Sequence, residues 1–182
     1  MYDHRNRDLA DKIISYSTAT KAGENVMIEL FGTNGVQLAQ EMARAVLDNG
    51  AVPFVVIRDT ETERILRERG TTEIWTRHRE VSGLPMMKAM DVYIGIRASE
   101  NIYELSSVAK DSNKAYSDEY LLPVHMTERV NNTRWCVMRY PSAAFAMNAH
   151  MSTAAFADFY YRSCLLDYAE LNERMKPLHE ML

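Results

Sequence analysis

Short apolar runs with strand character recur along this chain and alternate with helical segments, and this alternation constrains the fold most. The runs are rich in β-branched and aromatic residues and are bounded by glycine or polar residues, as strands are. The segments between them repeat apolar residues every three or four positions, as amphipathic helices do. Such alternation predicts an α/β domain with a doubly wound, mainly parallel sheet flanked by helices. The predicted strands span residues 25–31, 52–58, 91–97 and 134–140.

The run at 52–58 (VPFVVIR) is apolar at successive positions, which predicts a strand covered on both faces. A long helical region is expected over 102–129, interrupted at Pro123 because proline lacks an amide hydrogen. The remaining predicted helices span about 8–20, 36–49, 60–69, 84–90, 143–149 and 153–171.

Residues that start and stop helices are also recognisable. Asn34 is predicted to cap the helix at 36–49, and Gly50 to end it in the left-handed conformation. The sequence Thr60-x-x-Glu63 predicts a capping box for the next helix. Ser142 is expected to cap the short helix at 143–149, and Ser152 or Thr153 to cap the last helix.

The composition limits the classes of partner. With 182 residues, 47% of them hydrophobic and 25% charged, the chain has the size and apolar content of one globular domain. The net charge is -4 and no long Lys/Arg run occurs, so no nucleic-acid partner is expected. The longest apolar runs are far shorter than a membrane span, so no membrane association is expected.

The start of the chain and its cysteines favour a cytoplasmic location. Residues 1–11 are polar and charged, with no apolar stretch of a secretory leader. The two cysteines, Cys136 and Cys164, have no C-x-x-C spacing, so free structural thiols are expected.

No metal-binding motif is evident, although five histidines are present. Metal sites need three or four converging donors, and the nearest local pair, His78 and Glu80, matches no common ligand spacing. No metal ligand and no catalytic residue can therefore be singled out from these patterns. The histidines are His4, His78, His125, His150 and His179.

Two loops could take part in binding. The turn from Gly32 to Gly35 joins a strand to a helix, where anions can bind, but it lacks the known phosphate-binding patterns. The loop that follows the strand 91–97 lies at a carboxyl end of the sheet, where α/β proteins place ligand crevices. Arg97, Glu100 and Asn101 are therefore our candidate residues for a substrate cleft, the alternative being a solvated loop.

Several short stretches stand out in a fixed order along the chain. They are LAD at 9–11, KAGENVMI at 21–28, NGAVPFV at 49–55, MDVYI at 90–94 with EN at 100–101, W at 135, YPS at 140–142, AHMSTAAFADFY at 149–160 and LDY at 166–168. No single motif is diagnostic, but in combination, over nearly the whole chain, they resemble the amino-terminal domain of metallo-aminopeptidases of the thermophilic aminopeptidase (M29) type.

The resemblance implies an exopeptidase that releases amino-terminal residues from peptide substrates with two divalent metal ions, cobalt, zinc or magnesium. It implies a homodimer when full length, with metal ligands and catalytic groups in a carboxy-terminal domain. Residues 1–172 would then be the α/β amino-terminal domain, and 173–182 would start the connection to the catalytic domain. On this interpretation the 182-residue chain alone is catalytically inactive.

Two alternatives belong to other functional classes. The chain could be a self-contained module that binds a small ligand or anion through Gly32 to Gly35 and Arg97 to Asn101. It could also be an oligomerisation domain.

Overall fold

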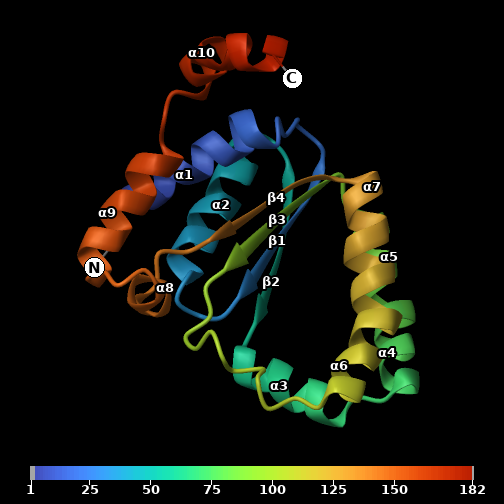
Figure 1. The fold of residues 1–182 in the computed structure, drawn as a ribbon. Helices are drawn as coiled ribbons and strands as arrows, with labels where there is room; N and C mark the ends of the chain where they lie inside the picture. Colours follow the sequence, from blue (N-terminus) through green and yellow to red (C-terminus); the bar gives the residue numbers. More distant parts are fainter. Residues whose placement is uncertain (1–2, 182) are drawn as a thin grey trace.

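The computed structural model describes residues 3–181 and shows one four-stranded sheet. The strand order is β2-β1-β3-β4, and every neighbouring pair is parallel. Helices connect the strands and cover both faces of the sheet (Figure 1), so the predicted doubly wound α/β fold is confirmed. The strands are β1 (Asn25–Phe31), β2 (Val52–Arg58), β3 (Val92–Arg97) and β4 (Arg134–Arg139).

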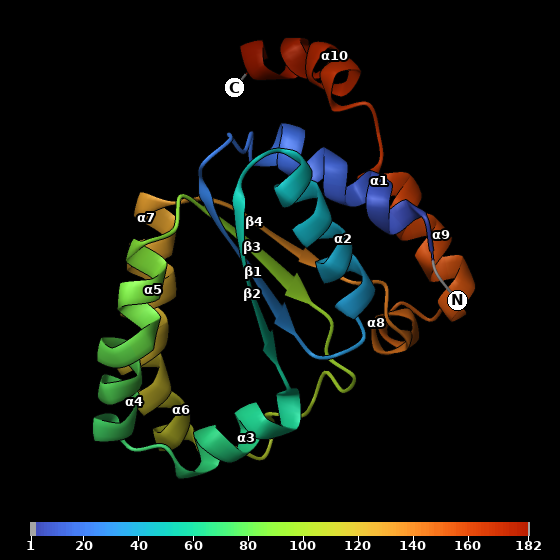
Figure 2. The ribbon, with the colours of Figure 1, turned by 180° about the vertical axis from the view of Figure 1, so that it is seen from behind.

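Most of the helical elements form two layers, one on each side of the sheet (Figures 1 and 2). Helices α1, α2 and α9 cover one face, and α4, α5, α6 and the π-helical segment η3 cover the other. The helical elements are α1 (Arg5–Lys12), η1 (Ile13–Ser17), α2 (Val36–Asp48), α3 (Thr60–Arg69), α4 (Thr72–His78), η2 (Arg79–Gly83), α5 (Leu84–Lys88), α6 (Lys110–Tyr116), η3 (Ser117–Arg129), α7 (Val130–Asn132), α8 (Ala143–Asn148), α9 (Thr153–Cys164) and α10 (Tyr168–Met181).

Alternating side chains of the two central strands supply both cores. On the first face, Val26, Ile28 and Leu30 of β1 are fully buried against α2 residues such as Leu38. On the second face, Met27 of β1 packs with the buried aromatic and methionine side chains of α4, α5, α6 and η3.

The prediction for β2 was wrong about its burial, although its bounds are confirmed. Val55 is 46% exposed and Ile57 is 52% exposed. Both side chains lie on the face of the first core, beside Ile28 and Leu30 of β1, but at the edge of the sheet. The strands buried on both faces are instead the central ones, β1 and β3.

Two predicted caps were wrong, each by one residue. Helix α2 is preceded by Gly35, and Asn34 makes no side-chain cap. Helix α3 is capped by Asp59, whose carboxylate accepts a hydrogen bond of 2.7 Å from the backbone N–H of Thr62. The predicted caps Ser142 and Ser152 are confirmed, as is the left-handed Gly50 with φ of 76°.

The helical predictions were wrong in three places. Residues 102–107 form turns, and the helix starts only at Lys110. Pro123 lies inside the π-helical segment η3 instead of interrupting it. The last predicted helix is two helices, since Asp167 accepts hydrogen bonds from the N–H groups of Ala169 and Glu170 and starts α10.

Helix α4 was not predicted, although it buries Trp75 in the second core. Helix α10 lies apart from the rest of the domain (Figure 1) and contacts it at its start, where the ring of Tyr168 stacks on Tyr16 at 5.6 Å between ring centroids. No helix within residues 3–181 is long and apolar enough to cross a membrane.

Candidate functional site

A cleft of about 300 Å³ opens where the chain order of the sheet reverses. The chain passes from β1 outward to β2 and then returns to β3 on the other side of β1, and open α/β sheets bind ligands at this point. Phe31 and Arg97, the last residues of β1 and β3, are paired in register. The guanidinium of Arg97 lies over the Phe31 ring, 4.0 Å from its centroid.

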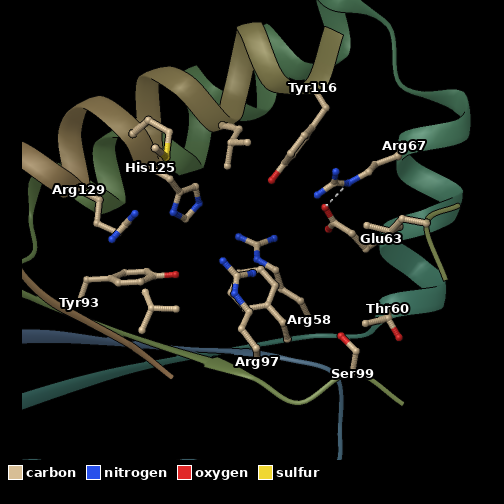
Figure 3. Close-up of a pocket in the computed structure, with 15 residues that line it drawn as sticks. Arg58, Thr60, Glu63, Arg67, Tyr93, Arg97, Ser99, Tyr116, His125 and Arg129 are labelled. Atoms are coloured by element: carbon tan, nitrogen blue, oxygen red, sulfur yellow. Dashed lines mark hydrogen bonds and ion pairs between the residues drawn. The ribbon is translucent and has the colours of Figure 1, made fainter. Parts of the chain in front are cut away.

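Cationic side chains converge on this arginine cleft from four elements (Figure 3). Arg58 and Arg97 rise from the ends of β2 and β3, Arg67 comes from α3, and Arg129 from η3. His125 of η3 points into the same space.

A buried carboxylate lies beneath the cleft. Glu29, in the middle of β1, has no exposed surface, and it forms an ion pair with Arg58. The hydroxyl of Tyr93 donates a 2.6 Å hydrogen bond to the other carboxylate oxygen. Burial of a charged carboxylate is costly unless it is paired and hydrogen-bonded, and Glu29 has both kinds of partner.

Gly95 makes room for the Tyr93 ring. A Cβ atom at Gly95 would lie 3.1 Å from Cε1 of Tyr93 and 3.2 Å from its hydroxyl. Glycine at this position therefore lets the ring lie flat along the sheet and bring its hydroxyl to Glu29. Burial raises the pKa of Tyr93 and the negative charge of Glu29 raises it further, so the phenol stays protonated as a donor.

The protonation of His125 is also controlled by its surroundings. Its Nε2 atom lies 4.0 Å from a carboxylate oxygen of Glu29. Burial lowers the pKa of His125, Glu29 opposes this, and the charges of Arg129, Arg58 and Arg97 lower the pKa further. The imidazole is therefore neutral at pH 7 and can donate or accept a hydrogen bond.

The far wall of the cleft is built on α3 and α6. Arg67 donates a 3.0 Å hydrogen bond to Glu63, one turn earlier on α3. The Arg67 guanidinium also stacks on the Tyr116 ring, 3.7 Å from its centroid. Burial raises the pKa of Tyr116 to about 12.

The three residues predicted for a substrate cleft lie in different places. Arg97 lines the arginine cleft. Glu100 and Asn101 line a separate, more open pocket of about 400 Å³ together with residues of α8. The side chain of Asn101 binds its own loop, since its oxygen accepts a 3.0 Å hydrogen bond from the N–H of Tyr103.

The negatively charged carboxylate of Glu100 binds in the turn between β1 and α2. Its carboxylate accepts hydrogen bonds from the N–H groups of Thr33 at 2.5 Å and Asn34 at 3.2 Å. Desolvation would raise the pKa of Glu100, but the hydrogen bonds from Thr33 and Thr60 outweigh it and lower the pKa. The turn from Gly32 to Gly35 is therefore occupied by an internal anion.

Gly32 is what allows the two loops to approach. It has φ of 88°, and a Cβ atom there would lie 2.3 Å from the carbonyl oxygen of Ala98. Only glycine fits this conformation and this contact.

Sequence reasoning missed Arg58, Arg67, His125 and Arg129. One signal was available, because Arg58 ends a predicted strand just as Arg97 does. Glu29 was a second signal, since it is the one charged residue within the apolar run NVMIELF. His125 and Arg129 lie in a helical region without a recognisable pattern, and only the packing of η3 on the sheet brings them to the cleft.

The geometry defines a doubly wound α/β domain with a cationic cleft at its switch point. The chain belongs to the thermophilic metalloprotease (M29) family, whose model matches residues 2–181. The fold is similar to that of a solved structure, wild-type AmpT from Thermus thermophilus, with a TM-score of 0.59 and 15% sequence identity. The match covers 84% of this chain and 42% of the AmpT chain, so this chain spans less than half of that protein. A search of curated proteins found no match.

Membership of a metalloprotease family raises the question of where metal ions would bind. Within residues 3–181, no group of three or more His, Cys, Asp or Glu side chains is arranged to hold a metal ion. The arginine cleft offers guanidinium groups, which donate hydrogen bonds and cannot ligate a cation. The described residues therefore do not fit the metal ions of the family, and we derive no metal-dependent step on them.

Proposed function

We propose that this chain acts as the amino-terminal α/β domain of a metal-dependent aminopeptidase, an exopeptidase that releases amino-terminal residues from peptides. The observation that carries the proposal is the match of the M29 family model to residues 2–181. In this proposal residues 1–172 form the domain, and 173–182 begin the connection to a carboxy-terminal domain that holds two divalent ions, cobalt, zinc or magnesium. The share of the AmpT chain that is matched, 42%, supports the presence of a further domain.

The role of this domain in the reaction would be to shape the approach of the substrate. Arg97 ends β3 at the carboxyl end of the sheet, and Glu100 and Asn101 lie on the connection that follows it. They would line the side of the substrate cleft that faces the catalytic domain. The proposal also includes a homodimer and a cytoplasmic location.

Isothermal titration of the 182-residue chain with cobalt and with zinc tests the placement of the metals. We expect no tight binding and no release of leucine from a leucyl peptide by the chain with either metal. A submicromolar two-metal site, or metal-dependent peptidase activity of this chain, would contradict the proposal.

A second experiment tests the aminopeptidase activity itself. The gene is expressed to its stop codon, and the product is assayed with cobalt or zinc on the same leucyl peptide with a free or an acetylated amino terminus. Hydrolysis only of the free form is expected. Equal cleavage of both forms would exclude an exopeptidase that recognises the amino terminus.

A further inference from the structure

The arginine cleft contains more positive than negative charge. Arg58 is paired with the buried Glu29, and Arg67 with Glu63. Arg97 and Arg129 have no carboxylate partner within the described residues 3–181. Four guanidinium groups therefore meet two carboxylates, which leaves two uncompensated positive charges in one enclosed space.

Arg129 is the more unusual of the two unpaired residues. It is only 8% exposed, and its Nη1 atom is buried without a hydrogen-bond partner. Its guanidinium lies over two aromatic rings from neighbouring strands, 5.2 Å from the centroid of Tyr93 and 4.5 Å from that of Trp135. The ring faces stabilise the cation but accept no conventional hydrogen bond. A buried donor without an acceptor costs free energy. The position of Arg129 therefore suits a bound ligand that supplies the missing acceptor.

Arg97 reaches the same cleft from the opposite side. Its guanidinium is stacked on Phe31 and lines the cleft, and its N–H groups form no side-chain hydrogen bond within residues 3–181 (Figure 3). The rings under Arg97 and Arg129 fix the planes of both groups. Fixed guanidinium planes favour bidentate hydrogen bonds to the oxygens of a carboxylate or phosphate.

We propose that the arginine cleft binds a small oxyanion carrying two negative charges, with Arg97 and Arg129 as its counter-charges. The volume of about 300 Å³ is at the lower end of small-molecule sites and suits a compact ligand. A phosphoryl group and a dicarboxylate share the required chemistry. The inference goes beyond the proposed peptidase function and does not depend on it.

The test uses the 182-residue chain and three sodium salts at equal ionic strength. Thermal unfolding and isothermal titration are measured with inorganic phosphate, succinate and acetate, with sodium chloride as the reference. We expect phosphate or succinate to raise the unfolding temperature above the chloride reference, and acetate to do so more weakly. Binding of phosphate alone identifies a phosphoryl ligand, and binding of succinate alone a dicarboxylate.

Arg97→Gln is the variant that tests the site, because Arg97 is exposed and forms no ion pair within the described residues. Loss of a charge-assisted, bidentate contact is expected to weaken anion binding about 10-fold to 100-fold. Arg162→Gln on α9 is the matched control, since it removes an exposed charge on the opposite face of the sheet and should leave binding unchanged.

Arg129 is tested by Arg129→Lys, with far-UV circular dichroism to verify folding. Lysine keeps the charge but loses the planar fork, so the folded variant should bind the anion at least several-fold more weakly. The proposal is overturned if none of the anions exceeds the chloride reference, or if Arg97→Gln and Arg162→Gln bind the anion equally well. These results say nothing about metal binding or peptidase activity, which the experiments on the proposed function measure separately.

Discussion

The two faces of the sheet share the same central strands but carry different side chains. On the face under α1, α2 and α9, β1 places Val26, Ile28 and Leu30 in an apolar core. On the face under η3, the same strand places Met27 and then Glu29, a buried carboxylate. One face therefore stabilises the domain by excluding water, whereas the other holds charges at a cost that is offset only by their partners.

This difference shows which face of the sheet carries the charged residues of the candidate site. The apolar face can be repacked with other apolar residues of similar volume at small cost. The charged face depends on particular partners. A buried charge that loses its ion-pair partner has neither water nor protein groups to stabilise it. The charged face also opens into the arginine cleft, so its network both supports the fold and determines the shape and charge of the candidate site.

The largest effect should come from breaking the charged face. Glu29→Ala leaves Arg58 without its carboxylate and Tyr93 without its acceptor, and we expect a loss of about 3–5 kcal/mol in the free energy of unfolding. Urea unfolding at pH 7 measures it.

A second substitution separates lost charge pairing from lost packing. Adding Arg58→Met to Glu29→Ala should recover part of the stability, because the uncompensated charge is removed. Leu38→Ala on the apolar face should cost about 2–5 kcal/mol through the cavity it leaves, and Arg58→Met should not restore it. A loss below about 1 kcal/mol for Glu29→Ala would show that the carboxylate is dispensable and would remove the contrast between the two faces.

An intermediate effect should distinguish the centre of the sheet from its edge. Val26→Thr buries a hydroxyl on β1 and is expected to cost about 1–3 kcal/mol. Val55→Thr makes the same change on the same face of β2, but this side chain is half exposed and the cost should be below about 0.5 kcal/mol. Equal losses in chemical denaturation would mean that a partner or a further segment covers β2 in solution.

The smallest effect should appear as a pH dependence on the charged face. The pKa of His125 is lowered in the folded state, so between the folded value and the unfolded value of about 6.5 only the unfolded chain binds the proton. Stability should therefore fall as the pH drops below about 6.5, by at most about 1.4 kcal/mol per pH unit.

His125→Gln should reduce this pH dependence, whereas the exposed His78→Gln should leave it unchanged. Unfolding free energies at pH 7.5 and pH 5.5 for the three proteins provide the measurement. An unchanged slope in His125→Gln would place the acid sensitivity elsewhere in the domain.

The sequence alone was sufficient for the class of fold and for the bounds of β1 and β2. Strand and helix signals are local, since they depend on the spacing of apolar residues within a few positions. Gly50 and the capping serines were predictable for the same reason, because each acts on its own helix end. The family was also recognisable from the order of short motifs, and the match of the family model agrees with it.

The tertiary structure was needed to find which strand lies at the edge of the sheet and which side chains share a cleft. The apolar run of β2 is typical of a strand covered on both faces, yet the strand order places it at the edge of the sheet, where Val55 and Ile57 stay about half exposed. Arg58, Arg97 and Arg129 are separated by dozens of residues and meet because β2, β3 and η3 converge at the switch point. Contacts between distant segments depend on how the whole domain packs, so local periodicity in the sequence does not predict them.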